Sequence, residues 1–163
     1  MCMIARDKII PLQRLPEWRA TIRAAGRCLV VTNGCFDLLH AGHVTYLEQA
    51  RAQGDLLLLG LNGDASVRAL KGEGRPIHPE EDRALVLAAL EAVGAVTIFP
   101  EVRAVRFLEL AQPDVYVKGG DYTLATINQD ERRAVENAGG RIVFQPFLPG
   151  RSTTRTLERI AHC

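Results

Sequence analysis

Five short apolar segments that alternate with helical periodicity constrain the fold of this chain most strongly. Leu56 to Leu61 is the clearest of them, because a nearly continuous run of leucines is typical of a parallel strand that helices cover on both faces. Alternation of strands and helices predicts a doubly wound α/β sheet of about five parallel strands, with helices on both faces. The strands are predicted at residues 28–32, 56–61, 95–99, 115–117 and 141–145.

The predicted connections place several polar loops at one edge of that sheet. Helices are expected at residues 16–25, 80–92, 102–111 and 129–138, with a short one ending near residue 70 and a last one after residue 154. Ligands bind beyond the carboxyl ends of the strands in such Rossmann-like folds, so we expect a single site there. The loops that meet at this edge are 32–43, 62–64, 118–122 and 146–154. We predict one domain over residues 1–163, with a helical segment at 1–26 and the α/β core at 27–163.

Charge and hydropathy argue against several classes of partner. The formal net charge is +1 and the basic residues are scattered, so we expect no nucleic acid as a partner. No apolar run approaches the ~18–20 residues of a bilayer span, and the first residues have no signal-peptide core. We therefore expect a cytoplasmic protein with no membrane contact. The four cysteines form no CxxC pair and have no zinc-like spacing with histidine.

The stretch from Thr32 to His43 carries the strongest chemical signal. It connects a buried strand to a helix that is expected to bear His40 and His43 and to continue through residues 44–52. Positions three apart share a helix face, so both imidazoles can contact one ligand, and Gly42 leaves room beside the backbone. The helix N-terminus adds unpaired N–H groups and a partial positive charge. A histidine pair alone is more often structural, but this setting indicates a phosphate site.

Two further positions have both a structural and a functional interpretation. Asp37 suits a helix cap or a magnesium-facing carboxylate, and the two roles are compatible. Ser152, with Thr153 and Thr154 behind it and Arg151 before it, suits a helix N-cap or the cradle of a second phosphate. Because this segment belongs to the predicted site edge, we favour the phosphate cradle.

The remaining candidates are weaker when each is taken alone. Lys118 to Asp121 joins a cation, two glycines and a carboxylate directly after a strand, which favours a site over a plain turn. Cys35 is more often a packing residue than a nucleophile, because no partner base can be assigned. Three cations suit solvated surface as well as a site: Lys71, Arg75 and Arg83. Three aromatic residues suit the core as well as ligand stacking: Phe36, Tyr122 and Phe147.

Together, the segment Gly34 to His43 and the triplet Ser152-Thr153-Thr154 resemble the nucleotidyltransferase superfamily that carries an HxGH signature and a late Ser-Thr-Thr. Over residues 27–160 the chain is most similar to the adenylyltransferase domain of bacterial ADP-heptose synthases. The blocks behind this closer resemblance are Thr32–Asp37, Asn62 with Asp64–Ser66, Leu70–Gly72 with Arg75–Pro76, Leu87–Val93 and Val117–Tyr122. The chain departs from that pattern at Gly63, His78 and Arg151.

The resemblance implies a reaction between ATP and D-glycero-β-D-manno-heptose 1-phosphate that gives ADP-heptose and pyrophosphate. A sugar-phosphate oxygen would attack the α-phosphorus in line, with Mg²⁺ held mostly by phosphates and Asp37 as its nearest protein ligand. The stand-alone form of the domain would receive its substrate from a separate sugar kinase. The resemblance is compatible with a homodimer, and it implies a place in lipopolysaccharide core assembly.

The resemblance also assigns roles to individual residues. Catalysis would fall to His40, His43 and Lys71. The nucleotide side would draw on Asn33, Gly34, Cys35, Phe36, Asp37, Gly42, Arg83, Lys118, Gly119, Asp121, Phe147, Ser152, Thr153 and Thr154. The sugar-phosphate side would be smaller, with Asn62, Asp64 and Arg75.

Two alternatives stay open at this point. A cytidylyltransferase acting on glycerol 3-phosphate or another phospho-alcohol would carry the same HxGH chemistry. A non-catalytic nucleotide-sensing domain would keep the fold and bind ATP without turnover, although it would not need transition-state contacts. A dinucleotide-dependent oxidoreductase is disfavoured, because no GxGxxG follows the first strand.

Overall fold

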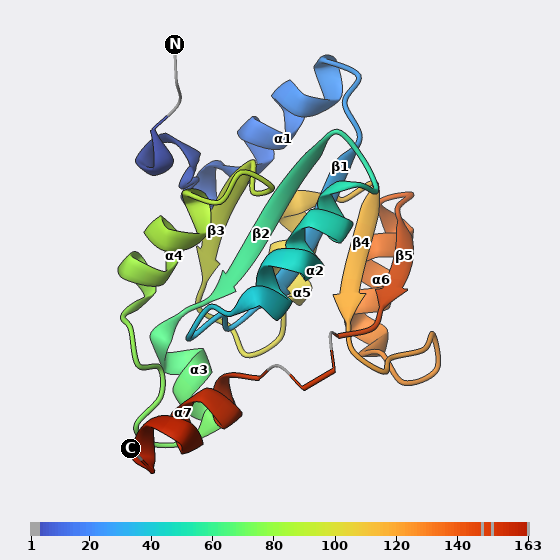
Figure 1. Ribbon diagram of the computed structural model, residues 1–163. Helices are drawn as coiled ribbons and strands as arrows, with labels where there is room; N and C mark the ends of the chain where they lie inside the picture. Colours follow the sequence, from blue (N-terminus) through green and yellow to red (C-terminus); the bar gives the residue numbers. More distant parts are fainter. Residues whose placement is uncertain (1–3, 148, 151, 163) are drawn as a thin grey trace.

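The protein is described by a computed structural model that covers residues 4–147, 149–150 and 152–162. Figure 1 shows a parallel sheet with the strand order β3-β2-β1-β4-β5. The expected α/β, Rossmann-like sheet of five parallel strands is confirmed. Its strands are β1 (Leu29–Gly34), β2 (Leu56–Asn62), β3 (Ala95–Phe99), β4 (Val115–Gly119) and β5 (Arg141–Gln145).

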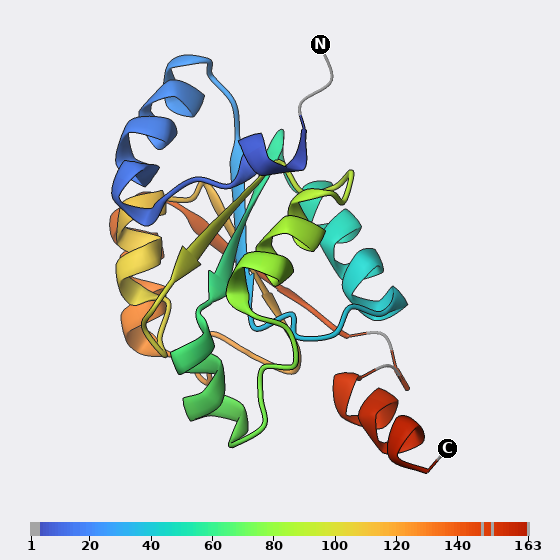
Figure 2. The ribbon, with the colours of Figure 1, turned by 90° about the vertical axis from the view of Figure 1, so that its left-hand side faces the viewer.

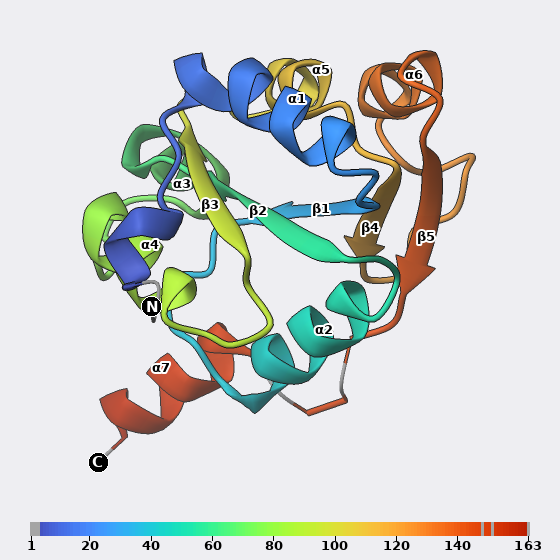
Figure 3. The same cartoon turned by 90° about the horizontal axis from the view of Figure 1, so that it is seen from above.

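Helices cover both faces of the sheet. Seen from above in Figure 3, α1, α5 and α6 lie on one side and α2 and α4 on the other, while α3 and α7 lie beyond the carboxyl edge (Figure 2). The α-helices are α1 (Leu15–Ala24), α2 (Ala41–Arg51), α3 (Asp64–Lys71), α4 (Glu80–Ala88), α5 (Val105–Ala111), α6 (Gln129–Asn137) and α7 (Thr153–Ala161). Two short 3₁₀ helices precede them, at Ala5–Lys8 and Leu12–Arg14.

The core consists of two apolar layers, one on each face of the sheet. On β1, Leu29 and Val31 pack toward α1, α5 and α6, whereas Val30 packs toward α2 and α4. The leucine run of β2 is divided in the same way, with Leu58 in the first layer and Leu57 in the second. All of these side chains are fully buried, which explains why the run shows no polar alternation.

Element ends differ from expectation where tertiary pairing decides them. β4 continues to Gly119 rather than stopping at Val117, because Lys118 and Gly119 pair with Phe144 and Gln145 of β5. Helix α4 ends at Ala88 rather than at Ala92, and α5 begins at Val105 rather than at Val102. Within the described part of the chain, no helix is long and apolar enough to cross a membrane.

Candidate active site

The ends of β1 and β4 separate at the carboxyl edge of the sheet. The β1–β2 ladder continues to the pair Gly34–Leu61, whereas the β1–β4 ladder ends at Val31–Tyr116. The strand order also reverses here, since β2 and β3 follow β1 on one side and β4 and β5 lie on the other. Such a switch point is where open α/β sheets bind ligands. We call the segments 32–34 and 117–119 the β1–β4 junction.

A tyrosine from α2 joins the two strands beyond the end of their ladder. The Tyr46 hydroxyl lies 2.7 Å from Oγ1 of Thr32 and donates to the carbonyl of Val117 at 3.2 Å. Burial raises the pKa of Tyr46 to about 12, so the hydroxyl keeps its proton at neutral pH. The junction is therefore closed by hydroxyl groups on the α2 face of the sheet.

His40 and His43 stack against each other where α2 begins. Their ring centroids are 3.9 Å apart with an interplanar angle of 24°. His40 is not inside the helix, as the spacing predicted, but is its extended N-cap residue, and His43 is the third helical residue. The two residues form a reciprocal capping box, in which Nδ1 of His43 accepts the backbone N–H of His40 at 3.3 Å. The pair shares one location, but capping geometry rather than a common helix face brings the rings together.

His43 is neutral in the protein alone. Burial, followed by the neighbouring His40, lowers the pKa of His43 to about 4. Because Nδ1 of His43 accepts a backbone N–H, the ring proton belongs on Nε2, which can donate to a ligand oxygen. The site thus presents a hydrogen-bond donor without a permanent positive charge.

Phe36 supports this pair from the core. Its side chain is buried beside α2, and its ring lies 5.3 Å from the ring of His43 in a tilted arrangement. The ring also covers Gly34, where an added Cβ would come within 2.8 Å of it. Phe36 packs beneath the histidines, and its expected nucleotide contact stays a prediction. Gly42 is likewise buried in the first turn of α2.

Asp37 ties the motif loop to the loop that precedes α4. One carboxylate oxygen pairs with the guanidinium of Arg75, and the other accepts the backbone N–H of Ile77 at 2.6 Å. Asp37 is buried, and it does not cap α2, since His40 occupies the N-cap position. Among the described residues no group of three His, Cys, Asp or Glu could hold a metal ion. The expected role of Asp37 as a helix cap is corrected, because His40 occupies that position, whereas its role as a magnesium ligand stays a prediction.

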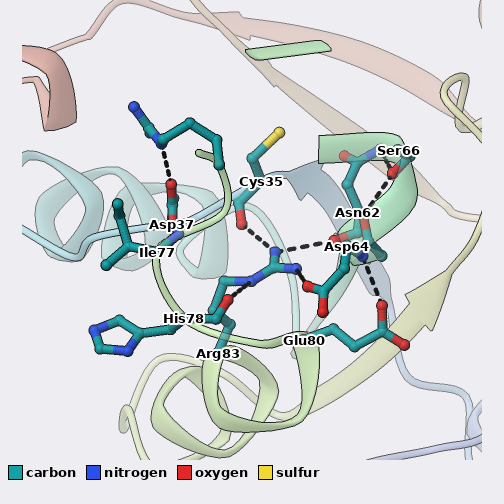
Figure 4. A network of polar contacts seen from close by, with 11 residues as sticks. Cys35, Asp37, Asn62, Asp64, Ser66, Ile77, His78, Glu80 and Arg83 are labelled. Atoms are coloured by element: carbon teal, nitrogen blue, oxygen red, sulfur yellow. Dashed lines mark hydrogen bonds and ion pairs between the residues drawn. The ribbon is translucent and has the colours of Figure 1, made fainter. Parts of the chain in front are cut away.

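Arg83 lies at the centre of a buried polar network, drawn in Figure 4. Its Nη1 donates to the carbonyls of Cys35 at 2.7 Å and Asn62 at 2.9 Å. Its Nε donates to the carbonyl of His78 at 3.0 Å, and its Nη2 pairs with the Asp64 carboxylate at 2.7 Å. We call these five residues the Arg83 cluster. Its guanidinium is buried and bonded to protein on every side, so a direct phosphate contact for Arg83 is not what the structure provides.

Two of the three predicted sugar-phosphate residues, Asn62 and Asp64, belong to the same network, whereas Arg75 pairs with Asp37. Asn62 is buried, and its amide nitrogen donates to Oγ of Ser66 at 3.2 Å and to the carbonyl of Glu101 at 3.3 Å. The backbone N–H of Asp64 donates to the Glu80 carboxylate at 2.6 Å. Asn62 and Asp64 thus bond to protein groups of the surrounding loops (Figure 4), and their contact with substrate stays a prediction.

A second polar cluster lies on the α5–α6 face of the β1–β4 junction. The Tyr116 hydroxyl donates to Oδ1 of Asn33 at 2.6 Å. The Lys118 ammonium donates to the Tyr116 hydroxyl at 3.2 Å and to the Glu131 carboxylate at 3.0 Å. We call Asn33, Tyr116, Lys118 and Glu131 the Tyr116 cluster. Lys118 is thus paired with a buried carboxylate instead of facing a nucleotide freely, as its sequence position suggested.

Aromatic rings line the junction beyond β4. An added Cβ at Gly119 would come within 2.5 Å of Phe147 and 2.9 Å of Tyr46, so only glycine fits there. Phe147 is 61% exposed and lies 6.0 Å from the Tyr46 ring. A hollow of about 180 Å³ has Gly42, Thr45, Tyr46, Gln49, Pro146, Phe147 and Pro149 as its lining. Phe147 is accordingly placed at the predicted edge with most of its ring available.

The late Ser-Thr-Thr segment reaches the motif loop from α7. The Ser152 side chain caps α7 by accepting the backbone N–H of Arg155 at 3.2 Å. Oγ1 of Thr153 donates to the carbonyl of Leu38 at 3.1 Å, two residues before His40. Thr154 is exposed, and Arg151 lies outside the described residues. The N-terminus of α7 therefore meets the histidine loop, as the shared edge predicted.

The remaining predicted residues occupy the rim of the site. Lys71 is the exposed last residue of α3, and Asp121 is exposed after β4. Cys35 turns its carbonyl toward Arg83 and its thiol away from it (Figure 4). Burial raises the pKa of the Cys35 thiol, against the opposing effect of Lys71, so the nucleophile interpretation gains nothing.

Sequence reasoning missed Tyr46, Tyr116 and Glu131. Tyr116 stands within an apolar strand and Glu131 in a charged helix segment, so neither pattern marked a site. One signal was available, because Tyr116 and Lys118 alternate along a strand and therefore lie on one face. Their buried partner on α6 could come only from the tertiary structure.

Comparison with protein families gives a match over most of the chain. A family model described as cytidylyltransferase-like matches residues 31–156. The bifunctional protein HldE of Geobacter sulfurreducens is 52% identical over 141 residues, which are 86% of this chain and 28% of that protein. The bifunctional protein HldE of Geotalea uraniireducens is 53% identical over 157 residues, which are 94% of this chain and 32% of that protein. The chain thus spans about a third of the length of the curated relatives it matches.

A solved structure has the same fold. The crystal structure of the lipopolysaccharide core biosynthesis protein from Thermoplasma volcanium GSS1 matches with a TM-score of 0.62 and 23% sequence identity. The match covers 76% of this chain and 98% of that one. At this level of identity the likeness concerns the fold.

Proposed function

The chain belongs to the cytidylyltransferase-like family of nucleotidyltransferases, and from this premise we propose that it transfers AMP from ATP to D-glycero-β-D-manno-heptose 1-phosphate. The products are ADP-heptose and pyrophosphate. Two sequence blocks support this substrate, Thr32–Asp37 and Val117–Tyr122, since both resemble ADP-heptose synthases. Relatives named bifunctional protein HldE, about half identical to this chain, support a nucleotidyl transfer reaction.

The stacked histidine pair at the N-terminus of α2 carries the proposal. It stands in the loop that follows β1, beside the β1–β4 junction, where this fold class binds ligands. Nε2 of His43 is a fixed donor. The N-terminus of α2 adds unpaired backbone N–H groups and the positive end of the helix dipole. This combination suits the oxygens of a triphosphate.

The reaction requires positioning and charge stabilisation more than proton transfer. A sugar-phosphate oxygen is already anionic, so it attacks the α-phosphorus in line and the bond to pyrophosphate breaks without a general base. His40 and His43 stabilise the charge that develops on the phosphoryl oxygens.

The other proposed contacts come from the rim. Ser152 and Thr154 at the start of α7 hold the β- and γ-phosphates, and the exposed ammonium of Lys71 reaches them from α3. Because Asp37 is engaged by Arg75 and Ile77, magnesium is held mostly by the phosphates, and ATP enters as its magnesium complex. Phe147 offers a ring for stacking the base.

The description of the family favours a second candidate, cytidylyl transfer from CTP to glycerol 3-phosphate. A pyrophosphate-release assay with ATP and CTP, each against heptose 1-phosphate and glycerol 3-phosphate, separates the two. We expect release only from ATP with heptose 1-phosphate. Equal release from CTP with glycerol 3-phosphate would contradict the proposed substrates, and ATP binding without release would favour a sensor.

The same assay tests the histidine pair. His43→Ala should lower kcat/KM by about 10²–10³, as loss of an oxyanion-type donor does. A decrease in kcat/KM of less than threefold would contradict a role of His43 in stabilising the transition state. Arg133→Leu, which removes an exposed ion pair on α6 away from the junction, is the matched control and should retain activity.

A further inference from the structure

Asn33 has one end of its carboxamide fixed by the protein. Oδ1 of Asn33 lies 2.6 Å from the Tyr116 hydroxyl. This separation is ordinary for an O–H···O bond but short for an N–H···O bond. Tyr116 is therefore the donor and the carbonyl oxygen of Asn33 the acceptor, which defines the orientation of the amide.

Lys118 and Glu131 determine where the single hydroxyl proton of Tyr116 goes. The Lys118 ammonium already donates to Oε2 of Glu131 at 3.0 Å and to the Tyr116 oxygen at 3.2 Å. Oε2 lies 3.3 Å from that oxygen, farther than Oδ1 of Asn33 does. The second carboxylate oxygen of Glu131 accepts the backbone N–H of Ala104 at 3.1 Å. With these acceptors supplied, the hydroxyl proton is directed to Asn33.

The opposite end of the amide lies at the β1–β4 junction. Within the described ranges of the chain, no acceptor is hydrogen-bonded to Nδ2 of Asn33. Asn33 is partly exposed and stands next to the last residue of β1, beyond the end of the β1–β4 ladder. An amide nitrogen carries two donors, and water or a ligand must receive them.

We propose that Tyr116 is a positioning residue, which fixes the Asn33 carboxamide so that its NH₂ group donates to a phosphoryl or hydroxyl oxygen of the bound substrate. Such an oxygen accepts hydrogen bonds. If the Asn33 carboxamide were rotated by 180°, its own acceptor Oδ1 would face this oxygen and no hydrogen bond could form. Lys118 and Glu131 serve the site through Tyr116 and not by contact with substrate. The identity of that substrate rests on the proposed function, whereas the orientation of the amide does not.

A double-mutant cycle tests the coupling between the two residues. Asn33→Ala should lower kcat/KM by about 10–100-fold, the range for a hydrogen bond to a charged oxygen. Tyr116→Phe keeps the ring and should lower kcat/KM by about 3–10-fold. In the Asn33→Ala background the Tyr116→Phe change should cost less than about twofold, because no amide is left to orient. Losses that multiply would overturn the proposal.

Tyr46→Phe is the matched control. It removes a buried hydroxyl from the other face of the same junction, where the partners are Thr32 and Val117. Thermal unfolding reports the stability cost of each hydroxyl separately. If Tyr116→Phe acted only by loosening the junction, both tyrosine variants would combine with Asn33→Ala in the same multiplicative way. We expect coupling for Tyr116 alone.

Separate constants identify the substrate and keep the two proposals distinct. The cycle is measured in KM for ATP and in KM for heptose 1-phosphate, and the coupled constant names the substrate that Asn33 contacts. If the wild type releases no pyrophosphate, the proposed function fails, and the cycle is repeated as Kd for each compound by calorimetry. Coupling in either Kd supports the positioning role, and its absence from both contradicts it.

Discussion

The Arg83 cluster and the Tyr116 cluster flank β1 on opposite sides but use their polar atoms differently. In the Arg83 cluster one buried guanidinium donates to three backbone carbonyls and one carboxylate. In the Tyr116 cluster a chain of side chains ends on Asn33, with the amide nitrogen left at the junction. The Arg83 cluster holds loops together, whereas the Tyr116 cluster fixes the orientation of Asn33, a partly exposed side chain.

The difference follows from the position of each cluster relative to the switch in strand order. β1 and β2 stay paired to their ends, so polar groups between them meet protein partners. β1 and β4 separate after Val31 and Tyr116, and Asn33, which lies beyond that point, is partly exposed. Side chains of similar chemistry thus become scaffold on one side of β1 and site on the other.

Removing Arg83 should have the largest effect on stability. Arg83→Leu leaves three carbonyls and the Asp64 carboxylate without their donor, so we expect a loss of about 3–5 kcal/mol in the free energy of unfolding. Denaturant titration measures it. Arg133→Leu, which breaks an exposed ion pair, should cost less than about 1 kcal/mol. Similar losses in the two variants would mean that the Arg83 cluster is not a scaffold.

Asp37→Asn should have an intermediate effect on stability. It tests whether Asp37 is a scaffold residue, like Arg83, or contacts a ligand. The amide keeps one acceptor but loses the charge that pairs with Arg75, so we expect a loss of about 1–3 kcal/mol in unfolding free energy. The magnesium concentration for half-maximal pyrophosphate release should stay within twofold of the wild type. An increase of tenfold or more would identify Asp37 as a metal ligand. Asp7→Asn removes an exposed carboxylate and serves as the control.

The expected effect that is smallest at neutral pH is a change in pH dependence due to His43. Its pKa is about 4 in the folded protein and 6.5 when unperturbed, so below pH 6.5 the unfolded chain binds a proton that the folded protein does not. This group therefore lowers the free energy of unfolding as the pH falls from 6.5 toward 4. Thermal unfolding of His43→Asn, which keeps an acceptor for the His40 N–H, should show a shallower decline over that range. Parallel curves for the two proteins would contradict the lowered pKa.

Much of the fold and the location of the site could be predicted from local patterns. Apolar periodicity identified β3 and β5 with their bounds, because each is a short uninterrupted run between clear turn residues. The parallel order of the strands was enough to predict which edge of the sheet carries the polar loops. Where a strand depends on its neighbour, prediction fell short, as at Lys118 and Gly119, which join β4 only through pairing with β5.

Individual roles were harder to predict than position. Arg83, Asn62 and Asp64 have the chemistry of phosphate and sugar contacts. Arg83 and Asn62 are buried against protein partners, and the partly exposed Asp64 is held by the Arg83 guanidinium. Phe36 has the chemistry of a stacking residue but packs beneath His43. A side chain's residue type limits what it can bind, and burial decides whether a ligand can reach it.

Local sequence patterns are enough to predict the class of fold, the edge of the candidate site and the histidine pair at that edge. These depend on periodicity and on groups within a few residues of each other, which local chain geometry controls. The separation of β1 and β4, the scaffold contacts of Arg83 and the hydrogen bond from Tyr116 to Asn33 become visible in the folded protein alone. Those outcomes depend on contacts between residues that are tens of positions apart, where packing determines which polar atoms are satisfied by protein and which are left for substrate.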